Sequence, residues 1–289
     1  MNESRQVPTT SATHALNNTR VAFIGGGNMA RSLIGGLIRN AILAENIVAA
    51  EPNAQLRDAL SEDFGIVCHA DNATALRKAD VVVLAVKPQV MRNVCAGLSD
   101  GVQHAKPLVI SIAAGIRVEQ LDHWLGGNVA IVRCMPNTPA LIGAGATGLF
   151  ANAHCNAAQR ESAQAILATA GSTAWIDKES LMDTVTAISG SAPAYFFALV
   201  EALEDAATAQ GLPRTIARAL ASQTCLGAGR MLREDAASPA QLRERVTSPG
   251  GTTQAALESF SADGFEAIVK RAVAAATHRG QELSAQLGD

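Results

Sequence analysis

Short β-branched runs alternate with amphipathic stretches over the first half of the chain. The runs that we expect to form strands are Val21–Ile24, Ile47–Ala50, Val81–Val86, Leu108–Ile112, Val129–Val132 and Thr173–Ile176. Between them, stretches such as Met29–Ile42 and Ala54–Phe64 carry apolar residues at helical spacing. Nearly continuous apolar strands that alternate with helices predict an α/β fold, with a parallel sheet covered by helices on both faces.

The second half of the chain shows helical patterns and no further strand pattern after Glu179. The expected helices are Ala192–Gln210, Arg214–Arg233, Pro239–Val246, Thr252–Phe260 and Gly264–Gln286. Residues 195–200 are apolar around most of the helix, so this segment must be buried on several sides. A domain of residues 180–289 is small to bury this segment on all of those sides by itself. Burial against a second subunit is the simplest solution, and we predict an obligate dimer.

Composition and charge narrow the choice of partners. Apolar residues make up 48% of the chain and charged residues 17%, which favours a sizeable core over disorder. The formal charge is −3 and the basic residues are scattered, so nucleic acid is not an expected partner. No uninterrupted apolar run approaches the roughly 18 residues of a membrane span, so membrane insertion is not expected either.

The cysteines and the N-terminus bear on the cellular context. The five cysteines lie far apart and form no C-x-x-C pair, which is typical of a reducing compartment where thiols act as small hydrophobes. We therefore expect a cytoplasmic protein without a metal site. Residues 1–19 are polar and lack the apolar segment of a signal peptide, which predicts a disordered extension.

A glycine loop follows the first expected strand. Its residues are Gly25, Gly26, Gly27, Asn28, Met29 and Ala30. In this G-x-G-x-x-A pattern the first glycine permits a tight turn and the second lets a pyrophosphate approach the backbone. The helix that begins here offers free N–H groups to the phosphates. Its position at a strand–helix junction predicts a dinucleotide-binding, doubly wound Rossmann domain over residues 20–179.

The sequence leaves the choice of dinucleotide open. Glu51 follows the second expected strand, in Ala50-Glu51-Pro52-Asn53. An acidic residue there usually binds the ribose 2′-hydroxyl of NAD and disfavours the 2′-phosphate of NADP. Glu51 could instead point to solvent while backbone groups bind the phosphate. The first arginine beyond it is Arg57.

Two further turns should face the cofactor, because ligands of open α/β sheets lie at the carboxyl ends of the strands. They contain Ala85, Val86, Lys87 and Pro88 in one case and Ile112, Ala113 and Ala114 in the other. Lys87 is either a surface lysine or a group near the cofactor. The segment 133–139 holds two prolines and is interpreted as a rigid connector between domains.

Two small polar turns each open a helix in the second half, at 189–195 and 246–253. Free N–H groups and Ser or Thr hydroxyls at a helix N-terminus suit a carboxylate ligand. Ordinary helix capping would explain either turn alone. Because two of them occur in a domain that also needs a substrate pocket, we favour a functional role.

The motifs together resemble one family. Gly25–Ala30, Ala85–Pro88, Ser111–Gly115, Arg133–Pro139, Ser189–Tyr195, Gly211–Arg214 and Ser248–Thr253 are similar in order and spacing to pyrroline-5-carboxylate reductases, over about residues 20–286. The Ser-Pro-Gly-Gly-x-Thr motif is far more specific than the glycine loop. The resemblance implies reduction of 1-pyrroline-5-carboxylate to L-proline by NADPH or NADH in the cytoplasm. It also implies a helical dimerisation and substrate domain at 180–289, with homodimers that assemble in some members into decamers.

The resemblance also implies roles for single residues. The glycine loop, Glu51, Pro52, Asn72, Ala85–Pro88 and Ile112–Ala114 would contact the cofactor, and Glu179, Ser248, Gly250, Gly251, Thr252 and Thr253 the substrate. The Thr253 hydroxyl would lie close to the ring nitrogen. Two positions depart from the pattern: Arg245 stands where relatives carry an Asn that touches the cofactor, and Glu51 replaces a small or hydroxyl residue common in NADPH-preferring members. Both departures concern cofactor preference.

The expected chemistry needs no strong acid. Hydride attack on a protonated imine gives an ammonium product directly, so a hydroxyl that orients the nitrogen suffices, and the motifs contain no His–carboxylate pair. A β-hydroxyacid dehydrogenase, the first alternative, would need a lysine early in the helix after 189–191, and 192–210 contains none. A non-catalytic NAD(P)-sensing protein, the second alternative, would not need the hydroxyls of the 248–253 turn.

Overall fold

The computed structural model describes residue 16, residues 18–40 and residues 42–286. Most of the extension predicted at residues 1–19 therefore lies outside the described residues. By its contacts the described chain divides into two compact units. One runs to Gly190 and also includes residues from Ala276 onward, and the other is Ser191–Ala275.

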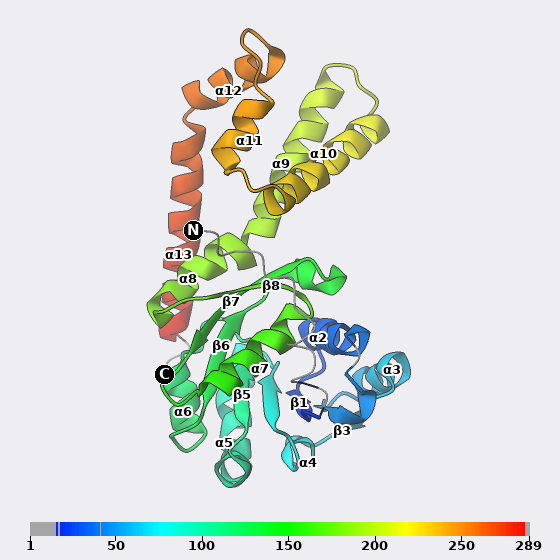
Figure 1. The fold of residues 1–289 in the computed structure, drawn as a ribbon, viewed down its shortest axis with the longest axis vertical. Helices are drawn as coiled ribbons and strands as arrows, with labels where there is room; N and C mark the ends of the chain where they lie inside the picture. The colour runs from blue at the N-terminus through cyan, green and yellow to red at the C-terminus, as the bar shows by residue number, and fades with distance from the viewer. Residues whose placement is uncertain (1–15, 17, 41, 287–289) are drawn as a thin grey trace. The chain divides into compact units, whose positions relative to one another are not determined.

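The first unit is built on an eight-stranded sheet (Figure 1). The strands are β1 (Val21–Ile24), β2 (Ile47–Ala50), β3 (Val67–His69), β4 (Val81–Leu84), β5 (Leu108–Ser111), β6 (Ile131–Met135), β7 (Gly145–Ala151) and β8 (Gly171–Trp175). Their order in the sheet is β3-β2-β1-β4-β5-β6-β7-β8. The first six strands are parallel and have the order of a doubly wound Rossmann sheet, which confirms the predicted fold class.

The two faces of the sheet bury different side chains, as alternation along a strand requires. The covering helices are α2 (Asn28–Arg39), α3 (Ala54–Phe64) and α7 (Ala157–Ala168) on one face, and α4 (Asn72–Leu76), α5 (Pro88–Ala105) and α6 (Val118–Trp124) on the other. Val21 and Phe23 of β1 join the first core, while Ala22 and Ile24 join the second. Nearly continuous apolar strands are therefore a consequence of burial on both faces.

The sheet is mixed because β7 runs antiparallel to β6. The connection between them is the short 3₁₀ segment η2 (Thr138–Ile142) with its flanking residues. A parallel crossover needs a dozen or more residues, so this connection can only return the chain in the opposite direction. The expectation of a wholly parallel sheet is wrong at β7, and β3 and β7 were not among the expected strands.

The second half of the chain is helical, as predicted. It begins with η3 (Glu179–Leu181), α8 (Met182–Val185) and the π-helical turn η4 (Thr186–Gly190), and continues with α9 (Ala192–Ala209), α10 (Arg214–Glu234), α11 (Pro239–Arg245), α12 (Thr252–Ala262) and α13 (Phe265–Gln286). The described residues contain no strand after Trp175. Near the end of α13, Ser284 Oγ donates to Asp183 Oδ1 of α8 at 3.4 Å. This contact joins the end of α13 to the first unit.

Helices α9 and α10 form a hairpin within the second unit (Figure 1). Glu204 is buried in α9 and accepts hydrogen bonds from Arg214 Nη1 at 2.8 Å and Arg218 Nε at 2.9 Å. Arg218, and then Arg214, hold the pKa of this carboxyl below its usual range. The buried charge is therefore compensated on two sides, which fixes the hairpin.

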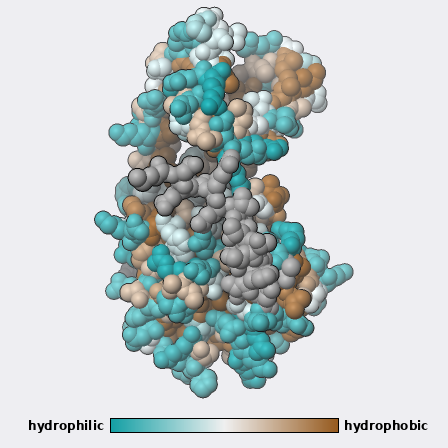
Figure 2. Space-filling model, viewed as in Figure 1, coloured by the Kyte–Doolittle hydropathy of each residue, from teal (hydrophilic) through white to brown (hydrophobic). Residues whose placement is uncertain are grey.

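Large apolar side chains remain exposed on this second unit. They include Phe196, Phe197 and Leu203 of α9, Leu220 and Leu226 of α10, and Ile268 and Val269 of α13. Figure 2 shows hydrophobic surface among the hydrophilic residues of the face it presents. Exposed apolar area of this kind marks an interaction surface.

One helical stretch of the described chain, residues 179–209, passes the length and hydropathy test for a membrane span. The expectation drawn from uninterrupted apolar runs did not include it. The stretch joins several short elements to α9, and only 6% of its most apolar window is buried in the single chain. Its mean hydropathy and its exposure are those of a helix that needs an apolar partner.

Candidate active site

The glycine loop is packed against the neighbouring turn at the carboxyl ends of β1 and β4. Gly25 has φ +101°, a conformation that favours glycine, and a Cβ built on it would lie 2.7 Å from the carbonyl oxygen of Ala85. The backbone N–H of Ala85 donates to Ile24 O at 2.8 Å, and Gly25 N–H to Ala50 O at 2.8 Å. These contacts bring the loop, Ala85 and the end of β2 to one edge of the sheet.

The N-terminus of α2 is shaped to receive an anion. Gly27 is the N-cap residue, and a Cβ built there would meet no atom within 4 Å. No side chain caps this terminus, and its first turn contains no acidic residue. The free N–H groups and the positive end of the helix dipole therefore face an open space, which suits a pyrophosphate.

Glu51 is tied to the glycine loop. Its Oε2 accepts the N–H of Gly26 at 2.8 Å, and its Oε1 accepts the N–H of Asn53 at 3.0 Å. Asn53 in turn caps α3 by accepting the N–H of Leu56 at 3.1 Å. Arg57 Nη1 donates to the carbonyl oxygens of Glu51 and Pro52, both at 2.8 Å. The carboxylate thus has a fixed position at the carboxyl end of β2.

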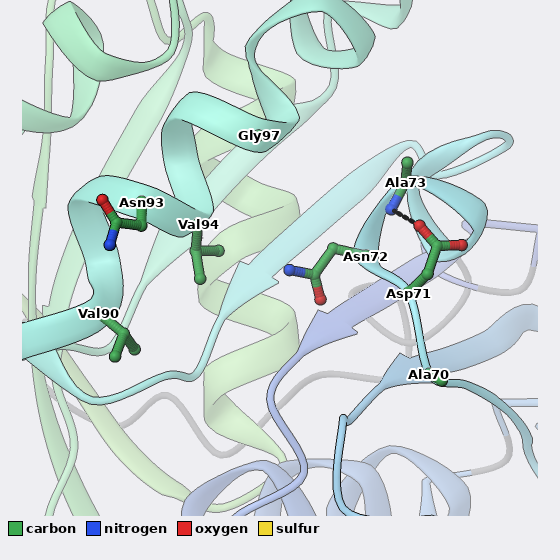
Figure 3. Close-up of a pocket in the computed structure, with 8 residues that line it drawn as sticks. All are labelled: Ala70, Asp71, Asn72, Ala73, Val90, Asn93, Val94 and Gly97. Carbon is green, nitrogen blue, oxygen red and sulfur yellow. Dashed lines mark hydrogen bonds between the residues drawn. The ribbon is translucent and has the colours of Figure 1, made fainter.

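A cavity of about 460 Å³ opens between the β3–α4 turn and α5 (Figure 3). It is lined by Ala70, Asp71, Asn72, Ala73, Val90, Asn93, Val94 and Gly97. The Asn72 side chain extends from the α4 side into this space, while Asn93 and Val94 come from α5. The cavity therefore combines apolar walls with two amides. Asn72 was a predicted cofactor residue, and Asn93 was missed because no motif in the sequence distinguishes it.

Asp71 fixes the shape of one side of this cavity. Its carboxylate caps α4 by accepting the N–H groups of Ala73 at 2.9 Å and Thr74 at 3.2 Å. A hydrogen bond from the Thr74 side chain, followed by the backbone N–H groups of Ala73 and Thr74, holds the pKa of Asp71 below its usual range. The turn that carries Asn72 is therefore held by a charge-assisted cap.

The turns after β4 and β5 lie beside one another. Pro88 occupies the first turn of α5, and Lys87 is its N-cap residue with no capping hydrogen bond from its side chain. The N–H of Ile112 donates to Leu84 O at 3.2 Å. Residues 85–88 and 112–114 therefore belong to neighbouring strands, and the glycine loop follows the strand on the other side of β4.

Arg133 and Glu179 form a shielded ion pair in the first unit. Arg133 Nη1 donates to Glu179 Oε1 at 2.8 Å, and the Arg133 side chain is only 4% exposed. The same oxygen accepts the N–H of Val118, the first residue of α6, at 2.9 Å. Glu179 thus joins η3 to β6 and α6. Glu179 was a predicted substrate contact, and its pairing with Arg133 was not predicted.

Asn137 links the segment 133–139 to its surroundings. Its Nδ2 donates to Ser189 O at 2.9 Å, and its Oδ1 accepts the N–H of Ala146 at 2.9 Å. Residues 133–135 belong to β6, so the expectation of a rigid connector between domains is wrong for this first part of the segment. The remainder, fixed by Asn137, holds β7 and η4 together.

The two small polar turns of the second half differ in structure. Ser189 and Gly190 belong to the π-helical turn η4, where Ser189 Oγ donates to Val185 O at 2.8 Å. The expectation of an open turn at 189–190 is therefore wrong, since the backbone there is already helical. Such π-helical turns interrupt the regular hydrogen bonding of a helix and are frequent at functional sites.

The turn at 246–253 has the open geometry that was expected. Gly250 has φ +69°, and its N–H donates to Gln254 Oε1 at 2.8 Å. The N–H of Gly251 donates to Ser248 O at 2.9 Å, and Gly251 is the N-cap residue of α12 without a side-chain cap. Thr252 and Thr253 occupy the first turn, which has no acidic residue. Free N–H groups and hydroxyls thus meet at this helix N-terminus.

Arg245 stands immediately before this turn, at the end of α11. Its Nη1 donates to Asp235 Oδ2 at 2.6 Å. A backbone hydrogen bond from Ala237, followed by the Arg245 guanidinium, holds the pKa of Asp235 below its usual range. The arginine is therefore paired within its own unit.

Two buried cysteines, Cys95 and Cys134, have no nucleophilic character in this structure. Burial raises the pKa of the Cys95 thiol to about 12 and also raises the pKa of the Cys134 thiol. Both are thiols at neutral pH and pack as small hydrophobes. Within residues 18–40 and 42–286, no three His, Cys, Asp or Glu side chains are placed to hold a metal ion.

Comparisons with known proteins agree for both halves of the chain. The family model described as pyrroline-5-carboxylate reductase dimerisation matches residues 179–283. The model described as NADP oxidoreductase coenzyme F420-dependent matches residues 20–115. A pyrroline-5-carboxylate reductase of Pseudomonas aeruginosa is 50% identical over 273 residues, which are 94% of this chain and 100% of that protein.

Solved structures give the same result. A pyrroline-5-carboxylate reductase from Coxiella burnetii has a TM-score of 0.90 at 42% identity, with 92% of this chain and 99% of that chain covered. Plasmodium falciparum pyrroline carboxylate reductase with NADP bound has a TM-score of 0.80 at 30% identity, with 93% and 99% covered.

Proposed function

This chain belongs to the pyrroline-5-carboxylate reductase family, and from that premise we propose which of its residues carry the reaction. It is an NAD(P)H-dependent oxidoreductase of proline biosynthesis, which reduces 1-pyrroline-5-carboxylate to proline. The observation that carries this conclusion is the 50% identity to a curated relative along that relative's whole length.

The coenzyme site comprises the loops at the carboxyl ends of β1, β2, β4 and β5. The α2 N-terminus with Gly25–Ala30 binds the pyrophosphate, which its free N–H groups and the open space at Gly27 support. Glu51 and Pro52 flank the adenosine ribose. Asn72 and the cavity beside it receive the adenine, since a flat base suits apolar walls with amides at the rim. Ala85–Pro88 and Ile112–Ala114 complete the site.

The substrate binds at the turn before α12. Ser248, Gly250, Gly251 and Thr252 form the turn that holds the substrate carboxylate, and the N–H groups of the first turn of α12 that have no internal acceptor donate to it. Thr253 orients the ring nitrogen through its hydroxyl. Glu179 is proposed to contact the substrate from η3. Its Oε1 is bonded to Arg133 and to the N–H of Val118, so the other oxygen, Oε2, would make this contact.

The mechanism relies on positioning. When bound, NAD(P)H supplies the hydride that reduces the C=N bond. The substrate imine binds protonated, so the nitrogen already carries the proton that the product retains. Thr253 accepts a hydrogen bond from that N–H and fixes the plane of the ring. A buried general acid is not required, and catalysis comes from orientation and from exclusion of water.

The activity is tested by mixing the protein with NAD(P)H and 1-pyrroline-5-carboxylate and following the nicotinamide absorbance. We expect oxidation of the coenzyme that depends on both components, with proline as the product. Oxidation with a β-hydroxyacid-derived semialdehyde instead would indicate a β-hydroxyacid dehydrogenase. Coenzyme binding without turnover of either substrate would indicate an NAD(P)-sensing protein.

The dimerisation domain assigned by the family model is proposed to form a homodimer through its exposed apolar helices. A bilayer is a poorer match for α9, because Glu201, Glu204 and Asp205 lie within it. Sedimentation at low protein concentration is expected to give at least twice the mass of one chain. Phe197→Asp on α9, where the ring is exposed, should shift the protein toward monomers. Leu43→Asp, at an exposed position of the first unit, is the matched control.

A folded monomer in sedimentation of the unaltered chain would contradict this proposal. Assembly of dimers into decamers is proposed from the resemblance alone. The remaining features of the proposal are domains at 20–179 and 180–289, a cytoplasmic location, and no nucleic-acid or membrane partner. The family models that match residues 20–115 and 179–283 support the two domains, and the scattered charges and the family's biosynthetic role support the proposed location and partners.

A further inference from the structure

We propose that Glu51 makes this enzyme bind NADH in preference to NADPH. The inference rests on the proposed coenzyme site and adds a specificity to it. Both oxygens of the Glu51 carboxylate are held by backbone N–H groups, from Gly26 at 2.8 Å and from Asn53 at 3.0 Å. The carboxylate therefore lies between the glycine loop and the start of α3, where the 2′-position of the adenosine ribose emerges in a Rossmann site.

Two of the N–H groups at the start of α3 that could bind a 2′-phosphate already have internal acceptors. The N–H of Asn53 bonds to Glu51, and the N–H of Leu56 bonds to the Asn53 side chain. A 2′-phosphate would have to displace these internal acceptors to bind either of these two N–H groups. A 2′-hydroxyl has no such requirement, because it donates a hydrogen bond to the carboxylate.

Arg57, the first basic residue after Glu51 in the sequence, does not offset this arrangement. Arg57 Nη1 is bonded to the backbone carbonyls of Glu51 and Pro52, so this guanidinium nitrogen faces the turn and not the glycine loop. Residues 52–56 contain no Lys, Arg, Ser or Thr. A phosphate beside Glu51 therefore meets a fixed negative charge with no hydroxyl from that segment to bind it.

Rotation of the Glu51 carboxylate away from a 2′-phosphate would relieve the repulsion between them only at a cost in free energy. Turning Glu51 away breaks both hydrogen bonds and leaves the Gly26 N–H without its acceptor. Gly26 is also tightly packed, since a Cβ there would lie 2.7 Å from Leu60 and 3.2 Å from Glu51. The glycine loop and the specificity residue are thus one packed structure.

The test compares dissociation constants for NADH and NADPH, measured without substrate by nicotinamide fluorescence. The unaltered enzyme is expected to bind NADH at least about tenfold more tightly. Glu51→Gln keeps the size of the side chain and removes the charge, and it should reduce the ratio of the two constants by about tenfold. Glu62→Gln, eleven residues further along and exposed on α3, removes the same charge and should leave the ratio unchanged.

A second pair of probes isolates the 2′-phosphate. Displacement of NADH by 5′-AMP and by 2′,5′-ADP, which differ only in that group, should show the same ratio and the same response to Glu51→Gln. Tighter binding of NADPH to the unaltered enzyme, or an unchanged ratio in a folded Glu51→Gln variant, overturns the inference. If neither coenzyme binds, the proposed coenzyme site fails and the inference fails with it. If the ratio behaves as expected without turnover of 1-pyrroline-5-carboxylate, the inference stands and the proposed substrate does not.

Discussion

Thr253→Ala is expected to lower kcat/KM for 1-pyrroline-5-carboxylate by about 100-fold, with the dissociation constant of NAD(P)H unchanged. Thr253 lies in the first turn of α12 beside the open 248–251 turn, half-buried and in a helix whose first turn has no acidic residue. If its hydroxyl fixes the ring nitrogen, its loss allows the ring to bind in unproductive orientations. Misorientation of the reacting groups has effects of this size. Steady-state kinetics and fluorescence titration of the coenzyme measure the two quantities.

The controls separate the hydroxyl from the fold. Thr253→Ser retains the hydroxyl and should recover most of the activity. Thr208→Ala removes a threonine from α9 of the same unit, where Oγ1 donates to Glu204 O at 2.7 Å, and should leave kcat/KM within about twofold of the unaltered enzyme. Unchanged kinetics in Thr253→Ala would remove this residue from the mechanism.

The sequence predicts the two-faced sheet well where burial is complete. The strands β1, β2, β4 and β5 are buried on both faces, so their apolar runs identify them without ambiguity. Edge strand β3 has one exposed residue and two half-buried ones in three positions, and it gives no such pattern. Strand β7 contains two glycines and a single large β-former, Phe150. Its position depends on pairing with β6 and β8, which local sequence does not encode.

In the candidate site, too, features that depend on adjacent residues could be predicted, and contacts between residues far apart in the sequence could not. The glycine loop is a local motif, and its backbone conformation and the open N-terminus of α2 follow from a few adjacent residues. The contact between Glu51 and Gly26 joins positions 25 residues apart, and that between Arg133 and Glu179 joins positions 46 apart. A single sequence gives the residue types at such positions but not their pairing. Asn93 was missed for the same reason, because it reaches the cavity only through the packing of α5 beside the β3–α4 turn.

The position of Glu179 adds a structural role to its proposed contact with substrate. The Arg133 side chain is almost fully buried, and it forms an ion pair with Glu179. The same carboxylate oxygen accepts the N–H that begins α6, which follows the 112–114 turn of the proposed coenzyme site. One side chain therefore holds together β6, α6 and η3. A loss of activity on changing Glu179 would not by itself indicate substrate binding, and stability must be measured beside it.

Glu179→Ala is expected to lower the free energy of unfolding by about 3–5 kcal/mol, because it leaves the Arg133 guanidinium buried without its counter-charge. For a chain of this size the loss corresponds to a decrease in Tm on the order of 10 °C. Calorimetry at one fixed protein concentration measures it, since oligomerisation also shifts Tm. Glu179→Gln keeps an acceptor for Val118 N–H and should be less destabilised.

The double variant Arg133→Met with Glu179→Leu distinguishes loss of a counter-charge from loss of packing. It removes both charges and replaces them with apolar side chains, so it should be more stable than Glu179→Ala alone. If the ion pair stabilises the fold only through packing, the double variant will be at least as destabilised as the sum of the single variants. If Glu179→Ala changes Tm by less than about 2 °C, the buried arginine must be solvated by water in the folded protein, and the pair is not the link between β6, α6 and η3 that its geometry indicates.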